Sequence, residues 1–125
     1  MSRPNMTPAA TQIRWVILKD GPITLAQFMA LALTHPDYGY YTTMSPIGSQ
    51  GDFTTAPEIN QTFGEILGLW ILDQWIRMGE PPVCALLELG PGRGTLMADI
   101  LRIARIRPRF LRALSVHLVE CSPLL

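Results

Sequence analysis

Residues 86–96, Leu-Leu-Glu-Leu-Gly-Pro-Gly-Arg-Gly-Thr-Leu, decide the fold of this chain. An apolar stretch runs into three glycines at alternate positions, Gly90, Gly92 and Gly94, and Glu88 stands two residues before the first of them. Glycines at such positions let the backbone turn sharply and let a ligand lie against it where a Cβ would collide. The stretch therefore predicts a strand, a nucleotide-cofactor turn and then a helix.

The spacing of the glycines indicates the cofactor. Dinucleotide sites favour G-x-G-x-x-G, whereas here one residue separates the second and third glycines, which gives Glu-x-Gly-x-Gly-x-Gly. This version resembles motif I of class I S-adenosyl-L-methionine (SAM) methyltransferases. The resemblance implies that Gly90, Gly92 and Gly94 lie against SAM and that Glu88 favours its cationic amino-acid end. An NAD-binding oxidoreductase would share the strand, turn and helix, and the spacing counts against this alternative.

Residues 115–120, Ser-Val-His-Leu-Val-Glu, predict a second buried strand that ends in a carboxylate. In a doubly wound fold the acid at this place accepts hydrogen bonds from the ribose hydroxyls, so Glu120 is the predicted ribose ligand. A helix-capping or solvated acid is the alternative. The connection contains a helix from Thr95 to about Ile106 and an insertion at residues 107–110, which place the acid further downstream than the roughly 20 residues of dinucleotide sites.

Helix signals organise the chain upstream of the turn. Residues 13–18 are an apolar stretch that suits a short helix, and a capping box at Thr24 predicts a helix to about Thr34. A loop follows through Gly51, and a second capping box at residues 55–58 predicts one helix reaching about Met78. The apolar side of that helix is expected to hold Ile59, Phe63, Ile66, Leu67, Trp70 and Ile71. We expect two parts, an N-terminal helical or lid segment over residues 1–80 and the start of a SAM-binding domain over residues 81–125.

The composition limits the kinds of partner that this chain is expected to bind. The 125 residues are 48% hydrophobic, carry no net charge and contain no run of eighteen apolar residues, which excludes a membrane span and a basic nucleic-acid footprint. We interpret the arginines that follow the turn as the solvated face of a helix and its exit loop rather than as an RNA patch. They are Arg102, Arg105, Arg107, Arg109 and Arg112.

Targeting and metal signals are lacking in the sequence. The polar residues 2–11 have neither the apolar core of a signal peptide nor the pattern of a transit peptide, so a cytoplasmic location is expected. Cys84 and Cys121 fall at opposite ends of the two predicted strands and are expected to be free thiols. His35 and His117 stand alone, and we predict no metal site.

A second motif makes the resemblance specific. Residues 51–58, Gly-Asp-Phe-Thr-Thr-Ala-Pro-Glu, and the Phe-Gly-Glu at 63–65 accompany Glu-Leu-Gly-Pro-Gly-Arg-Gly-Thr at 88–95. Together with Gly-Pro-Ile at 21–23 and Val-Glu-Cys-Ser-Pro at 119–123, they resemble the MidA family of SAM-dependent methyltransferases. The similarity covers residues 13–125, and Asn60 departs from it where a serine is expected.

The resemblance implies an α/β, Rossmann-like methyltransferase fold of which this chain holds the N-terminal helical segment and the first two parallel strands. It implies transfer of a methyl group from SAM to a protein arginine, of a respiratory complex I-type subunit. A chain of this extent is expected to be inactive alone and to associate through its exposed second strand. A non-catalytic assembly or interaction protein that keeps the SAM-binding fold is the further alternative.

Two carboxylates are weak candidates for catalysis. An arginine acceptor has a pKa above about 12, so it needs nearby carboxylates that orient it and receive its proton. Asp52 and Glu58 flank a loop that leads into a helix and are the local candidates. An Asx turn would explain Asp52 equally well, and the capping box would explain Glu58.

Overall fold

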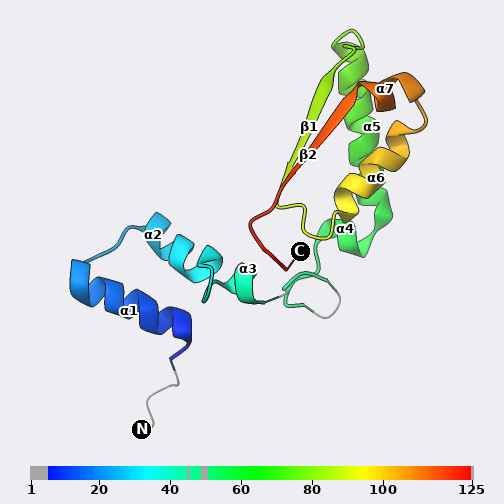
Figure 1. The fold of residues 1–125 in the computed structure, drawn as a ribbon. Coiled ribbons are helices and arrows are strands. Elements are labelled where there is room, and N and C mark those ends of the chain that lie inside the picture. Colours follow the sequence, from blue (N-terminus) through cyan, green and yellow to red (C-terminus); the bar gives the residue numbers. More distant parts are fainter. Residues whose placement is uncertain (1–5, 45, 49–50, 125) are drawn as a thin grey trace. The chain divides into compact units, whose positions relative to one another are not determined.

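A computed structural model describes residues 6–44, 46–48 and 51–124. Contacts between residues divide the chain into two compact units, Met1–Pro46 with Cys121–Leu125 and Ile47–Glu120. Figure 1 labels the helices and strands of both units. The predicted division at residues 80 and 81 stays a prediction. Parts of the predicted polar N-terminus and of the loop through Gly51 lie outside the described residues.

The first unit is helical. Helix α1, Pro8–Asp20, begins earlier than the apolar stretch suggested because the Thr7 hydroxyl accepts a hydrogen bond from the Ala10 N–H at 3.2 Å. The capping box at Thr24 is confirmed and opens α2, Leu25–Met29. A π-helical turn, η1, continues it over Ala30–Thr34, and this helix ends where we predicted.

A one-turn helix, α3, spans Tyr40–Thr43 and was missed by the sequence analysis. Its threonine hydroxyls close the turn locally, since Thr42 and Thr43 both donate to the Gly39 carbonyl, at 3.0 and 2.6 Å. Such side-chain bonds have no signature in hydrophobic periodicity.

The second unit starts its helices with a break that we did not predict. Helix α4 spans Ala56–Ile59 and α5 spans Gln61–Arg77, so the expected single helix is wrong. Asn60 separates them because its backbone is extended, with φ −152° and ψ 122°, and its side chain accepts from the Thr62 N–H at 2.8 Å. The predicted capping box at Thr55 is wrong as well, because the Thr55 side chain makes no cap hydrogen bond.

Helix α5 packs through its glycines. Gly64, Gly68 and Trp75 are its buried residues, and Figure 1 shows α5 and α6 side by side on the same side of the sheet. The predicted apolar face is therefore wrong in part. Four of its members are exposed, by 71%, 47%, 61% and 59%: Ile59, Phe63, Ile66 and Trp70.

Helix α5 buries the face that carries its glycines because α6 approaches that face closely. A Cβ built on Gly64 would lie 2.6 Å from the Asp99 Cβ, and one on Gly68 would lie 3.1 Å from the Ile100 Cα. Only glycine leaves room for the neighbouring helix at such distances.

Replacing Gly64 by alanine is expected to lower the free energy of unfolding by about 1–3 kcal/mol, because the added methyl group overpacks against buried Asp99. In an unconstrained helix the same change would stabilise by about 0.5–1 kcal/mol, so the sign is diagnostic. Chemical denaturation of the full-length protein checks it. Exposed Thr62→Ala, in the first turn of α5, is the control and should change stability by less than about 0.5 kcal/mol. A stabilised Gly64→Ala variant would contradict this packing.

The sheet has two parallel strands, β1 at Cys84–Leu89 and β2 at Leu114–Val119. The register pairs Leu89 with Val119, so both strands end at the same level. Helix α6, Thr95–Ala104, connects them together with a short helix α7, Pro108–Ala113. The predicted α/β class with two parallel strands is confirmed.

A small core packs α7 against α5, α6 and the first residues of the two strands. Phe110 is fully buried, and its ring centroid lies 5.2 Å from that of Trp75. Ala104 and Ala113 complete the cluster. The predicted insertion at residues 107–110 is thus the beginning of a packed helix, because Pro108 suits its first position.

All five arginines after the turn are exposed; Arg102 pairs with Asp99 at 2.6 Å. Within the described residues neither Cys84 nor Cys121 forms a disulfide. No helix within the described residues is long and apolar enough to span a membrane.

Candidate functional site

The glycine turn joins β1 to α6 with left-handed backbone at each glycine. The φ angles are 67° at Gly90, 54° at Gly92 and 77° at Gly94. The Gly90 N–H donates to the Val119 carbonyl at 2.8 Å, and the Gly94 N–H donates to the Pro91 carbonyl at 2.9 Å. These bonds fix the turn against the end of β2, in a conformation that residues with a Cβ adopt only with strain.

Glu88 is the half-buried carboxylate beside the turn. Its Oε2 atom is buried and has no hydrogen-bond partner within the described part of the chain. Burial raises the pKa of the Glu88 carboxyl above its usual value. A buried carboxylate oxygen without a donor is costly, and a bound ammonium group would supply the missing donors.

Glu120 follows β2 and reaches the turn. Its Oε2 accepts a hydrogen bond from the Gly92 N–H at 3.1 Å. The parallel register explains the contact, since Leu89 and Val119 are paired immediately before Gly90 and Glu120. A carboxylate has room for further donors, and the ribose role of Glu120 stays a prediction.

The second motif lies against the first. The Thr95 hydroxyl donates to Glu58 Oε1 at 2.6 Å, and Arg93 Nη1 lies 3.5 Å from Glu58 Oε2. The Glu58 side chain is only 16% exposed. Ile47 covers the turn, with its Cδ1 atom 3.6 Å from the position of a Cβ on Gly92. Two motifs far apart in the sequence therefore form one structure.

A pocket of about 270 Å³ lies where these motifs meet. Four of the predicted site residues line it: Glu58, Glu88, Gly90 and Gly92. The lining also includes residues that the sequence analysis missed: Ile47, Thr55, Pro57, Arg93 and Thr95. The pairing of the two motifs was the signal that could have located them.

Three predicted residues are not among the lining residues: Asp52, Gly94 and Glu120. Asp52 is exposed and takes part in an interaction of its own. Glu120 touches the turn through Gly92. The pocket therefore brings together the cofactor residues on β1 with Glu58 and leaves Asp52 outside its wall.

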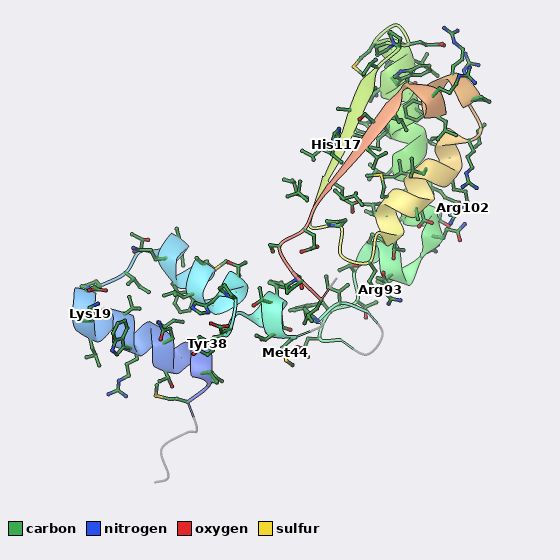
Figure 2. All side chains as sticks on the ribbon, viewed as in Figure 1. Lys19, Tyr38, Met44, Arg93, Arg102 and His117 are labelled. Atoms are coloured by element: carbon green, nitrogen blue, oxygen red, sulfur yellow. The ribbon has the colours of Figure 1, made fainter. Side chains whose placement is uncertain are left out.

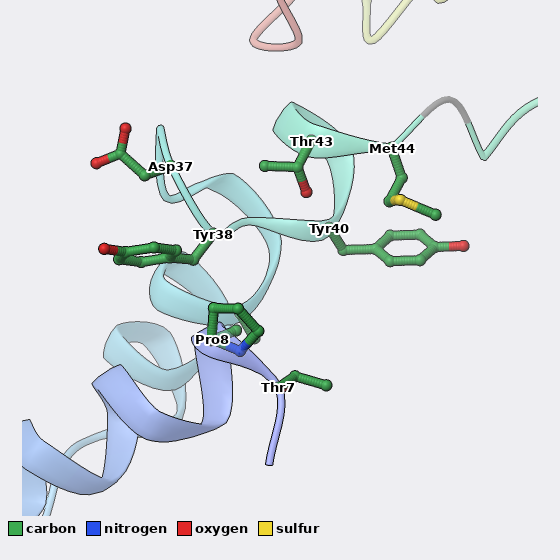
Figure 3. A pocket seen from close by; sticks show the side chains of 9 residues that line it. Thr7, Pro8, Asp37, Tyr38, Tyr40, Thr43 and Met44 are labelled. Atoms are coloured by element: carbon green, nitrogen blue, oxygen red, sulfur yellow. The ribbon is translucent and has the colours of Figure 1, made fainter. Parts of the chain in front are cut away.

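A larger pocket of about 460 Å³ belongs to the first unit. Figure 3 shows its tyrosines, Tyr38 and Tyr40, on opposite sides of Pro8. None of the residues predicted for the cofactor or for catalysis lines it. The candidate functional site is therefore the smaller pocket at the glycine turn.

The strand, the left-handed glycine turn and the acid after the next parallel strand define the class of proteins that bind a nucleotide cofactor on an α/β fold. Residues 66–125 match a family model described as "Putative S-adenosyl-L-methionine-dependent methyltransferase". Over these residues, just under half of its length, the chain is similar to that family. SAM, the cofactor predicted from the glycine spacing, is the cofactor in the family description, which confirms the prediction.

Individual relatives are similar over nearly the whole chain. Identity is 48% over 119 residues to "Protein arginine methyltransferase NDUFAF7, mitochondrial" of Mus musculus and 45% over 119 residues to that of Homo sapiens. The homolog of Drosophila melanogaster is 46% identical over 118 residues. These alignments cover 93–94% of this chain and 26–27% of the relatives, so the chain spans about a quarter of their length.

The expected cytoplasmic location is wrong, because these relatives are named mitochondrial. The expectation rested on the lack of a targeting pattern in residues 2–11, and this lack does not exclude a mitochondrial location.

Proposed function

We propose that the full-length protein is a SAM-dependent protein arginine methyltransferase whose cofactor pocket is the one at the glycine turn. The similarity over 94% of the chain to relatives named protein arginine methyltransferase carries this proposal. The family description and the buried, unpaired Glu88 oxygen beside the turn support it.

The roles proposed for the residues follow from their positions. Gly90, Gly92 and Gly94 let the backbone lie against the cofactor. Glu88 accepts hydrogen bonds from its ammonium group, in place of the donors that Glu88 Oε2 lacks within the described residues. Glu120, already bonded to the Gly92 N–H, accepts from the ribose hydroxyls.

SAM supplies an electrophilic methyl group when bound. In the overall reaction a guanidine nitrogen forms the bond to the methyl carbon, the bond from that carbon to sulfur breaks, and the nitrogen gives up a proton. The protein contributes by holding the two reactants in line. Glu58 is poorly suited to accept the proton, because one of its oxygens is bonded to Thr95 and the other faces Arg93. Asp52 stays a candidate for that role.

The proposed substrate is an arginine of a protein, of the respiratory complex I type, and the proposed location is the mitochondrion. The relatives' names support the arginine and the location. The complex I substrate rests on the family resemblance of the two motifs. A NAD-dependent oxidoreductase has no support from the family description.

Incubation of the full-length protein with radiolabelled SAM and a mitochondrial extract is expected to label protein arginines.

Glu88→Gln should weaken SAM binding roughly tenfold, since it removes a charge-assisted bond. Burial raises the pKa of Glu88, so its carboxylate takes up a proton at a higher pH than an ordinary glutamate, whose pKa is about 4.3. As the pH falls, SAM binding by the unaltered protein should therefore begin to weaken above that value. Titration calorimetry over a pH series measures both effects.

Asp73→Asn, on the exposed surface of α5, is the control for the same chemical change and should leave SAM affinity unaltered. SAM binding without methyl transfer to any arginine would favour the non-catalytic alternative. If neither SAM nor its demethylated product binds, the proposed function is wrong.

A further inference from the structure

Arg93 brings a positive charge to the pocket that Glu88 lines. Arg93 comes from the turn itself and Glu88 from the strand before it, so their relative positions are set by the backbone between them. Figure 2 labels Arg93 at the turn between β1 and α6. One small pocket thus offers a carboxylate and a guanidinium.

Glu58 contacts Arg93 but uses only part of the hydrogen-bonding capacity of its guanidinium. The Glu58 carboxylate is fixed by the 2.6 Å bond from Thr95, and Arg93 Nη1 meets its other oxygen at a long 3.5 Å. Arg93 also lies against the loop, since a Cβ on Gly48 would be 3.1 Å from Nη1. A guanidinium has five N–H donors in a planar fork, and most of them have no acceptor within the described residues.

The ion pair between Arg93 and Glu58 is too weak for stabilisation of the fold to be the main role of Arg93. Its side chain is 59% exposed, and ion pairs of exposed groups contribute little because solvent screens them. The weak pairing leaves the fork available to a carboxylate, which it can bind through two parallel hydrogen bonds.

We propose that Arg93 binds the α-carboxylate of the ligand while Glu88 binds its ammonium, so that the pocket selects a zwitterionic α-amino-acid end. Glu58 is a positioning residue that orients Arg93. The proposal rests on the proposed function, which supplies SAM as the ligand. The pocket volume of about 270 Å³ is below the roughly 300–1,000 Å³ of pockets that enclose whole drug-sized ligands, which suits one end of SAM.

The test compares SAM with decarboxylated SAM, which lacks only the carboxylate, by titration calorimetry of the full-length protein. The unaltered protein should bind SAM roughly tenfold more tightly than decarboxylated SAM, because one charge-assisted contact at a partly solvated site has about this effect. Arg93→Gln should abolish this preference and leave the affinity for decarboxylated SAM within about twofold. Arg93→Lys, which keeps the charge and loses the fork, should retain part of the preference.

Arg105→Gln is the matched control, because Arg105 is exposed at the end of α6 and has no ion pair within the described residues. It should keep the full preference. A preference that survives in Arg93→Gln, or an equal loss of affinity for both ligands, would overturn the role of Arg93 while leaving the proposed function intact. Failure of the unaltered protein to bind either ligand would overturn the proposed function and this inference together.

Discussion

Gly92→Val is expected to weaken SAM binding by on the order of a hundredfold. The φ angle of Gly92 is 54°, where a residue with a Cβ is strained by about 1–2 kcal/mol, and β-branching adds to this. The strain is relieved when the turn shifts, which moves the Gly92 N–H away from Glu120 and removes the surface on which the cofactor would lie. Titration calorimetry with SAM measures the loss.

Gly79→Val separates this effect from backbone strain in general. Gly79 has a φ of 86°, and a Cβ there meets no atom within 4 Å, so the variant carries similar strain at a turn outside the pocket. It should lose stability to a similar degree and keep its affinity for SAM. If Gly92→Val binds SAM as tightly as Gly79→Val does, the glycine turn is not the cofactor site.

Phe110→Ala is expected to lower the free energy of unfolding by about 3–5 kcal/mol, the range for removing a fully buried aromatic side chain. The cavity would open beside Trp75, whose fluorescence can follow denaturation of the full-length protein. Because Phe110 anchors the helix that leads directly into β2, the loss should also loosen that strand.

Leu111→Ala, at the next position of α7, provides the control. Leu111 is 38% exposed, and its truncation should change stability by less than about 1 kcal/mol. Equal losses for the two variants would mean that α7 is not packed through Phe110.

The strand, turn and helix around the glycines were predictable because each is fixed by local chemistry. Apolar residues before the turn, glycines at positive φ and the periodic helix that follows leave little freedom to tertiary context. The same holds for the capping box at Thr24. The parallel pairing of β1 with β2 followed from the helix between them.

The face of α5 was predicted wrongly because periodicity counts apolar residues and ignores how near a neighbour can come. Gly64 and Gly68 carry no apolar side chain, yet they are the buried positions because α6 packs against them. Asn60 was likewise read as the interior of one helix, although its side chain caps the next. The first error concerns packing between two helices, whereas the second concerns a local cap two residues along the chain.

The site was predictable in part for a related reason. Glu88 and the glycines belong to one continuous motif, and sequence spacing suffices to group them. Arg93 and Thr95 were missed because their partner, Glu58, belongs to the other motif and only the folded chain brings them together. The sequence around Glu58 suggested a capping box with Thr55, whereas the Glu58 carboxylate accepts a hydrogen bond from the Thr95 hydroxyl.

The bond between Glu58 and Thr95 joins positions 37 residues apart. Closing so long a segment has an entropic cost that only the packing of the elements between them, α5 and β1, can offset. The pocket is therefore a property of the assembled unit, and the unfolded chain has no partial version of it. A ligand of this pocket binds the folded state alone, and its concentration sets how much stability it adds, about 2.7 kcal/mol at a hundred times the dissociation constant.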